Sequence, residues 1–213
     1  RVGLLLVAGG QGTRLGFDGP KGAYPIGPVS KRSLFAFHAE KIHNIQNRYG
    51  CTLPWYIMVS ETNEEPTRAF FGQNDYFGLN AEDIVFFRQR MAPCVDYKGR
   101  FMLDAPDRLA MNPNGHGGVI PAMVENGLTD DARKRGVDTL SYFQVDNWAI
   151  KVADPFFIDD LSTYLTFDTS TLTSIVDASY FTQADASYWS GPTYVLLWCD
   201  ANVVVEKQVT GYD

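Results

Sequence analysis

The residues with the clearest chemical potential form a glycine-rich loop near the start of the chain. Residues 9–16 read GGQGTRLG, and Pro20-Lys21-Gly22 follow shortly afterwards. Closely spaced glycines let backbone N–H groups approach an anion because no Cβ stands in the way. Arg14 offers a planar, forked donor and Lys21 a point charge, and both suit phosphate oxygens. We therefore expect this loop to bind a phosphorylated ligand.

The two commonest phosphate-binding motifs do not match this loop. A P-loop requires GxxxxGK[ST], but residues 16–21 read GFDGPK and no Gly-Lys-Ser/Thr sequence is present there. The dinucleotide fingerprint GxGxxG fails because Leu15 occupies its last glycine position. A GxGxxxG pattern starting at Gly10 remains, which leaves a nicotinamide-dependent oxidoreductase as one alternative. Pro20 speaks against a helix starting at this loop.

A loop of this kind needs rigid elements to hold it, and the hydrophobic pattern predicts them. Apolar runs of strand length occupy residues 2–8, 54–59, 83–88 and 139–145. Between them the patterns predict helices over residues 33–49, 64–71, 117–126 and 130–135. This alternation predicts an α/β, Rossmann-like fold, a mostly parallel sheet with helices on both faces. Ligands of such sheets bind beyond the carboxyl ends of the strands, where the glycine loop and Asp146 fall.

The composition changes after residue 158. Acidic and basic residues balance over residues 1–158, whereas residues 159–213 contain eight acidic residues and Lys207 as the single basic one. This last part therefore accounts for the whole net charge of −7. Strand-like runs at 171–176, 193–199 and 202–207 predict a small β-rich C-terminal part. We divide the chain into an α/β domain, residues 1–158, and a β-rich segment, residues 159–213.

Composition also excludes several classes of protein. The net negative charge disfavours nucleic-acid binding, and no apolar run approaches the roughly 20 residues that span a membrane. Three widely spaced cysteines, Cys51, Cys94 and Cys199, argue against a disulfide framework or a cysteine zinc site and favour the cytoplasm. A strand directly after Arg1 leads us to expect a fragment of a longer enzyme.

Residues 6–22, LVAGGQGTRLGFDGPKG, resemble the signature loop of the UDP-sugar pyrophosphorylase family, most closely its UDP-N-acetylglucosamine pyrophosphorylase branch. Further matching blocks follow in the family's order: PWYIMVS at 54–60, FFRQRMAP at 86–93, AMNPNGHGG at 110–118 and VDNWAIKVADP at 145–155. Each block alone is weak, but five in order make a specific resemblance. It implies a nucleotidyltransferase-type domain over residues 1–158.

The resemblance implies a uridylyltransferase that joins UTP and a hexose 1-phosphate, with N-acetylglucosamine 1-phosphate favoured, to give a UDP-sugar and pyrophosphate. It also implies Mg²⁺ as cofactor. The sugar phosphate is already a nucleophile, so the protein must mainly align two anions and neutralise their charge. A UDP-glucose or broad-specificity enzyme is an alternative that His116 also fits. An inactive nucleotide-binding fragment is another, because the family's sugar-pocket motifs are not found in residues 159–213. The oligomeric state stays open.

The resemblance also implies roles for residues of the opening loop. It places uracil and ribose against the backbone of four residues: Val7, Ala8, Gly9 and Gly10. It assigns the triphosphate to Gly12, Thr13 and Arg14, and it makes Lys21 the cation that stabilises the α-phosphate during transfer. Arg14 and Lys21 are the two residues with an implied catalytic role.

Four residues further along the chain complete the implied site. Gln89 would read uracil, because a primary amide has a donor and an acceptor that match O4 and N3–H. Gly115 and His116 would form a second glycine turn over the nucleoside. Asp146 would bind Mg²⁺, which commonly uses one or two carboxylates together with phosphate oxygens. Taken singly, each has a structural alternative, such as a turn-capping role for Asp146.

Overall fold

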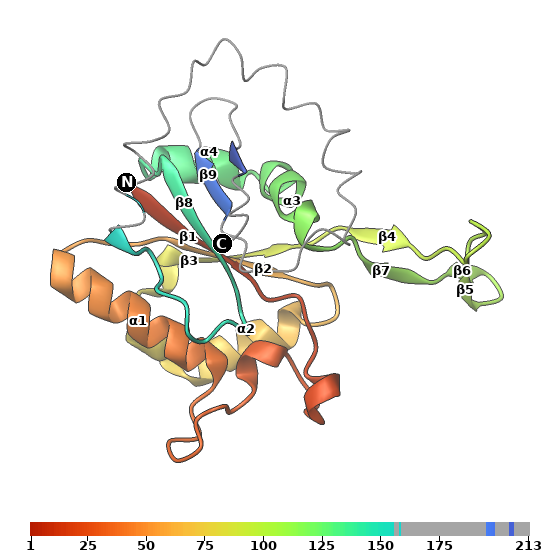
Figure 1. Cartoon of the computed structure of the whole chain (residues 1–213), viewed down its shortest axis with the longest axis horizontal. Helices are drawn as coiled ribbons and strands as arrows, with labels where there is room; N and C mark the ends of the chain where they lie inside the picture. Colours follow the sequence, from red (N-terminus) through yellow and green to blue (C-terminus); the bar gives the residue numbers. More distant parts are fainter. Residues whose placement is uncertain (156–157, 159–194, 199–204, 207–213) are drawn as a thin grey trace, which may run out of the picture.

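The computed structural model describes residues 1–155, 158, 195–198 and 205–206, and its centre is one sheet (Figure 1). Its middle consists of four parallel strands: β1 (Val2–Val7), β2 (Trp55–Val59), β3 (Ile84–Arg88) and β8 (Thr139–Gln144). They lie in the order β8-β1-β2-β3, so the chain crosses back after β3 to place β8 beside β1. The predicted α/β fold with a mostly parallel sheet is confirmed.

Two strands from the C-terminal part of the chain extend the same sheet. β9 (Val195–Trp198) pairs antiparallel with β8, and β10 (Val205–Glu206) pairs antiparallel with β9. They fall within the strands predicted at 193–199 and 202–207. The strand predicted at 171–176 lies outside the described residues, and the division of the chain after residue 158 stays a prediction.

Helices cover both faces of the sheet, as predicted (Figure 1). α1 (Leu34–Tyr49) and α2 (Glu64–Gln73) pack on one face, and α3 (Val119–Glu125) and α4 (Leu128–Lys134) pack on the other. The Ser33 hydroxyl caps α1 by accepting from the Ala36 amide at 3.2 Å. Gly50 ends α1 with a φ of 58°, a left-handed conformation that favours glycine.

The core has two halves because alternate side chains of a strand point to opposite faces. Leu4 and Leu6 of β1 pack with Phe35 and Phe71 on the face of α1 and α2, whereas Leu5 packs on the face of α3 and α4. All five side chains are fully buried. This double burial explains the continuous apolar runs in the sequence. It also fixes the strand ends, where the candidate site lies.

Short 3₁₀ turns connect the main elements: η1 (Thr13–Leu15), η2 (Lys21–Ala23), η3 (Asp75–Gly78), η4 (Ala81–Asp83) and η5 (His116–Gly118). The first α-helix after the glycine loop begins only at Leu34. A dinucleotide-binding loop leads directly into a helix that receives the pyrophosphate. The GxGxxxG pattern therefore lacks the structure that a nicotinamide-dependent oxidoreductase requires.

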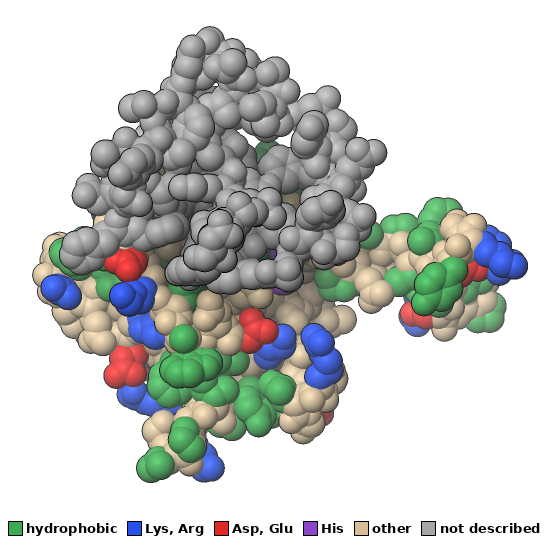
Figure 2. Space-filling model, in the orientation of Figure 1, with side chains coloured by type: hydrophobic (Ala, Val, Ile, Leu, Met, Phe, Trp, Pro, Cys, Tyr) green, Lys and Arg blue, Asp and Glu red, His purple; other side chains and the backbone are tan. Residues whose placement is uncertain are grey.

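An arm formed by residues 91–113 projects from the sheet and was not predicted (Figure 1). In it β4 (Met91–Pro93) pairs with β7 (Met111–Pro113), and β5 (Leu103–Ala105) pairs with β6 (Arg108–Leu109). Figure 2 shows hydrophobic side chains along this arm. Two of its aromatic residues, Tyr97 and Phe101, are exposed. Strands this short, without a buried face, carry no clear alternating pattern.

The turn after Lys21 is packed against the core so closely that only glycine fits at position 22. A Cβ on Gly22 would lie 2.2–2.5 Å from ring atoms of Phe35. The Phe35 ring is fully buried, and its centroid lies 4.9 Å from that of Phe71, so it has no room to move away. We expect Gly22→Ala to lower the free energy of unfolding by about 1–3 kcal/mol, as overpacking usually does. Urea denaturation measures this loss.

Gly72→Ala is the matched control for this prediction. Gly72 lies in α2, and a Cβ there would meet no atom within 4 Å. Alanine in a helix interior is more favourable than glycine by roughly 0.5–1 kcal/mol, so Gly72→Ala is expected to stabilise the protein. A Gly22→Ala variant as stable as the wild type would show that the core does not confine this turn.

Candidate functional site

The candidate site lies at the carboxyl edge of the parallel strands. Four strands end at this edge and each is followed by residues of interest: the loop 8–22 after β1, Ser60 and Asn63 after β2, Gln89 after β3, and Asp146 after β8. Parallel pairing of the four strands places these segments side by side. The structure thus brings together residues that are far apart in the sequence.

The glycine loop folds back on itself as a narrow turn. The Gly12 amide donates to Gly19 O at 2.8 Å, and the Lys21 amide donates to Gly10 O at 3.0 Å. Between these two bonds η1 forms one helical turn, which ends at Gly16 with a φ of 65°. The first amides of a helical turn have no partner within the turn, which leaves those of Thr13 and Arg14 suited to an anion. The side chains of both residues are exposed.

Asn63 anchors this loop from beneath, a role that sequence reasoning missed. Its fully buried side-chain amide donates to Ala8 O at 2.8 Å and to Gly10 O at 3.3 Å. Its Oδ1 accepts from the Ser60 amide at 2.7 Å. Asn63 stands directly before α2 but makes no capping bond to that helix. The one signal in the sequence was an asparagine at a helix start, and that signal normally indicates a cap.

Lys21 and Asp146 meet above the glycine loop. Lys21 Nζ lies 3.1 Å from Asp146 Oδ2, although the two residues are 125 positions apart. A Cβ on Gly10 would lie 3.7 Å from Lys21 Nζ, so the ammonium lies close to the loop backbone. The Asp146 side chain is about half exposed, at 49%. An ion pair this exposed contributes little to stability, so both charges can turn to a ligand.

Gln89 lies between the glycine loop and the second glycine turn. The buried side chain donates from Nε2 to Gly115 O at 2.6 Å. On its other side, a Cβ on Gly9 would lie 2.9 Å from Gln89 Oε1. Gly115 has a φ of 81°, which favours glycine at this turn. One N–H of the Gln89 amide is thus hydrogen-bonded within the protein, while its second N–H and its carbonyl oxygen remain available to bind a base.

His116, at the start of η5, faces the same region. Its Nδ1 lies 3.2 Å from Nε2 of Gln144, the last residue of β8. Burial lowers the pKa of His116, Asp146 opposes that shift, and Lys21 adds to it. Burial thus favours the neutral ring, and in that form an amide donating to Nδ1 leaves the proton on Nε2. Gln144 is a further contact that sequence reasoning missed.

Val7 and Ala8 contribute only backbone to this edge. Their side chains are buried, and the Ala8 amide donates to Met58 O at 2.8 Å. Any contact of these two residues with a ligand would therefore be through their backbone. Of the predicted site residues, Lys21, Gln89, Gly115, His116 and Asp146 come together around the glycine loop, while the side chain of Arg14 remains exposed to solvent.

Comparison with known sequences assigns the chain to a family. The sequence profile of the UTP–glucose-1-phosphate uridylyltransferase family matches residues 1–170. The chain belongs to this family. The match covers all four parallel strands and every loop described above.

Two curated relatives and one solved structure are similar to this uridylyltransferase-family chain. It is 45% identical over 164 residues to the UDP-N-acetylhexosamine pyrophosphorylase-like protein 1 of Xenopus tropicalis, covering 74% of this chain and 32% of the relative. It is 44% identical over 161 residues to the UDP-N-acetylglucosamine pyrophosphorylase of Saccharomyces cerevisiae, covering 74% and 34%. The structure of the Trypanosoma brucei UDP-N-acetylglucosamine pyrophosphorylase superposes with a TM-score of 0.69 at 34% identity, covering 76% and 35%. The chain thus spans about a third of the length of these relatives.

The residues present can hold Mg²⁺ only with help from a ligand. Within the described part of this uridylyltransferase-family chain, no three His, Cys, Asp or Glu side chains are grouped closely enough for a metal site. Asp146 offers one carboxylate, half exposed, beside the glycine loop. Mg²⁺ suits such a place because it keeps water and substrate phosphate oxygens among its ligands. The donor set therefore fits a Mg²⁺ that arrives with a nucleotide.

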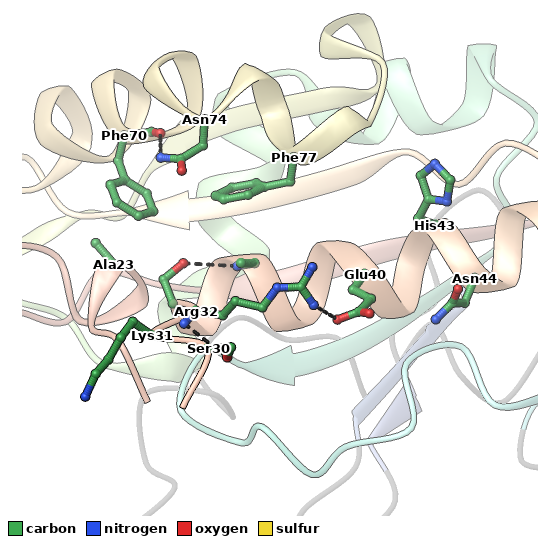
Figure 3. A pocket seen from close by; sticks show the side chains of 12 residues that line it. Ala23, Ser30, Lys31, Arg32, Glu40, His43, Asn44, Phe70, Asn74 and Phe77 are labelled. Atoms are coloured by element: carbon green, nitrogen blue, oxygen red, sulfur yellow. Dashed lines mark hydrogen bonds and ion pairs between the residues drawn. The ribbon is translucent and has the colours of Figure 1, made fainter. Parts of the chain in front are cut away.

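A separate cavity of about 670 Å³ lies between α1, the loop 23–33 and the end of α2 (Figure 3). Phe70 and Phe77 lie on one side of it and Lys31 and Arg32 on the other. Arg32 is already paired with Glu40 at 2.5 Å. None of the residues that the sequence singled out lines this cavity, and it is not at the strand ends. We therefore place the candidate site at the glycine loop and not here.

Proposed function

We propose that the protein containing this chain is a uridylyltransferase. It would join UTP and a hexose 1-phosphate, with N-acetylglucosamine 1-phosphate favoured, to give a UDP-sugar and pyrophosphate. The observation that carries the proposal is the meeting of Lys21 and Asp146, 3.1 Å apart, above the glycine loop. A cation and a carboxylate beside free backbone amides suit a metal-bound triphosphate. Membership of the uridylyltransferase family and the named relatives support the same reading.

In the proposed reaction, an oxygen of the sugar phosphate attacks the α-phosphorus of UTP. The new O–P bond forms as the bond between the α-phosphorus and the bridging oxygen breaks, and pyrophosphate leaves. No general base is required because the attacking oxygen is already ionised near neutral pH. The chain's task is to align the two anions and to offset their negative charge.

Each group at the strand edge has a part in this task. The amides of Thr13 and Arg14 would bind phosphate oxygens, and the Arg14 side chain would reach the outer phosphates from solvent. Lys21, released from Asp146, would neutralise the charge that develops on the α-phosphate. Asp146 would hold Mg²⁺, which supplies positive charge to the phosphates when bound.

The backbone of Val7, Ala8, Gly9 and Gly10 and the turn at Gly115 and His116 would enclose the nucleoside. Gln89 connects these two parts, since its amide bonds to Gly115 O and its oxygen faces Gly9. A base placed there would meet one donor and one acceptor from the same amide, as uracil O4 and N3–H require. We therefore propose Gln89 as the residue that selects uracil.

Replacing Gln89 by leucine should reduce the preference for UTP over CTP by about 10-fold, the effect of losing one discriminating hydrogen bond. Calorimetric titration of both nucleotides measures the ratio of their dissociation constants. Gln73→Leu is the control, because Gln73 is exposed at the end of α2 and not at the glycine loop. An unchanged UTP-to-CTP ratio in Gln89→Leu would remove Gln89 from the base site.

The decisive test of the reaction is pyrophosphate release from UTP by the full-length protein with a panel of sugar 1-phosphates, with and without Mg²⁺. We expect release to depend on Mg²⁺ and to be fastest with N-acetylglucosamine 1-phosphate. Equal or faster release with glucose 1-phosphate would favour a UDP-glucose or broad-specificity enzyme. No release with any sugar, together with tight UTP binding, would leave only a nucleotide-binding module and overturn the proposed function.

We also propose that the protein acts in the cytoplasm on small molecules and does not bind nucleic acid. Cys51 and Cys94 are free thiols, which fits a reducing compartment. No helix in the described part of the chain is long and apolar enough to cross a membrane. The net charge of −7 offers nucleic acid no electrostatic attraction.

A further inference from the structure

Two side chains of α1 hold the segment that carries Asp146. His38 Nε2 lies 2.9 Å from Val145 O. One turn further along α1, Lys41 Nζ donates to Trp148 O and to Ile150 O, the latter at 3.0 Å. Figure 1 shows this segment, which follows β8, running across α1. Asp146 therefore lies between two points at which α1 fixes the backbone.

Burying the His38 side chain costs free energy, and its hydrogen bond to Val145 O offsets part of that cost. The ring is fully buried against Phe143, with centroids 5.2 Å apart. Its Nδ1 has no hydrogen-bond partner among the described residues, and a buried polar atom in that state costs about 1–3 kcal/mol. Burial lowers the pKa of His38 to about 4, so the ring is neutral and donates from Nε2. The favourable polar contact of this ring is therefore the bond to Val145 O.

The bond from His38 to Val145 O fixes the peptide group that joins Val145 to Asp146. The Val145 carbonyl and the Asp146 amide belong to one planar unit, so holding the carbonyl oxygen sets the orientation of the Asp146 backbone. The Val145 amide is itself held by Val7 O at 3.1 Å. With both sides of Val145 restrained, the Asp146 carboxylate is directed at Lys21 Nζ, 3.1 Å away.

We propose that His38, supported by Lys41, is a positioning residue for Asp146: it holds the Val145–Asp146 peptide so that the carboxylate faces the glycine loop and the phosphates there. This inference rests on the proposed function. No hydrogen bond or ion pair joins either side chain to Lys21 or the glycine loop, so both would act through the backbone of residues 145–150. Residues that orient a metal ligand commonly change metal affinity or activity by 10–100-fold when they are replaced.

The test compares His38→Leu with His38→Gln in the full-length protein. Leucine removes the donor, whereas the glutamine amide can reach the same carbonyl from the same helix position. We expect His38→Leu to raise the Mg²⁺ concentration for half-maximal rate about 10-fold and to lower kcat, with little change in KM for the sugar phosphate. His38→Gln should restore most of both values. His43→Leu, on the same helix but lining the separate cavity, is the control.

A second readout does not depend on turnover. Binding of Mn²⁺ in the presence of UTP, followed by electron paramagnetic resonance, should weaken about 10-fold in His38→Leu and recover in His38→Gln. If His38→Leu does not fold, Lys41→Met is measured in the same way and should show a smaller shift in the same direction. A variant that is only less stable, with unchanged Mn²⁺ affinity and Mg²⁺ dependence, would overturn the positioning role. Absence of Mg²⁺-dependent turnover in the wild type would instead contradict the proposed function.

Discussion

Lys21→Ala is expected to lower kcat about 100-fold or more while changing the dissociation constant of UTP less than about 5-fold. The proposed function gives the ammonium its largest role when charge develops on the α-phosphate, and the loop amides still bind the ground-state nucleotide. Stability should hardly change, because the partner Asp146 is half exposed and the pair contributes little. Steady-state kinetics and calorimetric titration of UTP measure the two quantities.

Lys31→Ala is the matched control for Lys21→Ala. Lys31 lies ten residues further along the chain and lines the cavity beside α1, not the glycine loop. Its replacement should leave kcat and UTP affinity as in the wild type. Equal losses of kcat and UTP affinity in Lys21→Ala would contradict a transition-state role. A larger loss from Lys31→Ala would place the reaction in the cavity.

Asn63→Ala should cause the largest loss of stability among the variants considered, about 3 kcal/mol. Without the amide, Ala8 O and the Ser60 amide lose bonds of 2.8 and 2.7 Å, and each buried polar group left without a partner costs about 1–3 kcal/mol. The glycine loop would also lose its anchor at Gly10 O. We therefore expect UTP affinity to fall about 10-fold even where the variant is fully folded.

Urea denaturation and UTP titration at a temperature well below unfolding separate the two effects of Asn63→Ala. Asn126→Ala provides the comparison, because that partly exposed amide donates only to Ala122 O within its own helix region, at 2.7 Å. Asn126→Ala should lower the free energy of unfolding by less than about 1 kcal/mol and bind UTP as tightly as the wild type. Unchanged UTP affinity in Asn63→Ala would mean that the loop does not need this anchor.

The main strands and helices were predictable because the sequence patterns that indicate them are local. Strands buried on both faces read as apolar runs, such as residues 2–8, and Ser33 and Gly50 mark the ends of α1 by their own backbone chemistry. The arm at residues 91–113 was missed because its short strands have no buried face to impose an alternating pattern. Tyr97 and Phe101, apolar but exposed, give no sign of a strand pair.

The part of the candidate site that lies within sequence motifs could be predicted. Lys21, Gln89 and Asp146 follow strands in recognisable blocks, and the parallel sheet brings those blocks to one edge. Asn63 and His38 lie outside the residues that these blocks singled out. Their roles depend on hydrogen bonds to residues 55 and 107 positions away. Such contacts exist only after folding, so no spacing within the sequence indicates them.

Hydrogen–deuterium exchange with and without UTP and Mg²⁺ tests most directly whether a uridine triphosphate binds at the glycine loop. We predict slower exchange on UTP addition in the glycine loop, around Gln89 and in the turn at Gly115 and His116. CTP at the same concentration should give weaker protection there. Protection confined to the cavity, residues 30–36 and 70–77, with unchanged exchange in the glycine loop, would contradict the account.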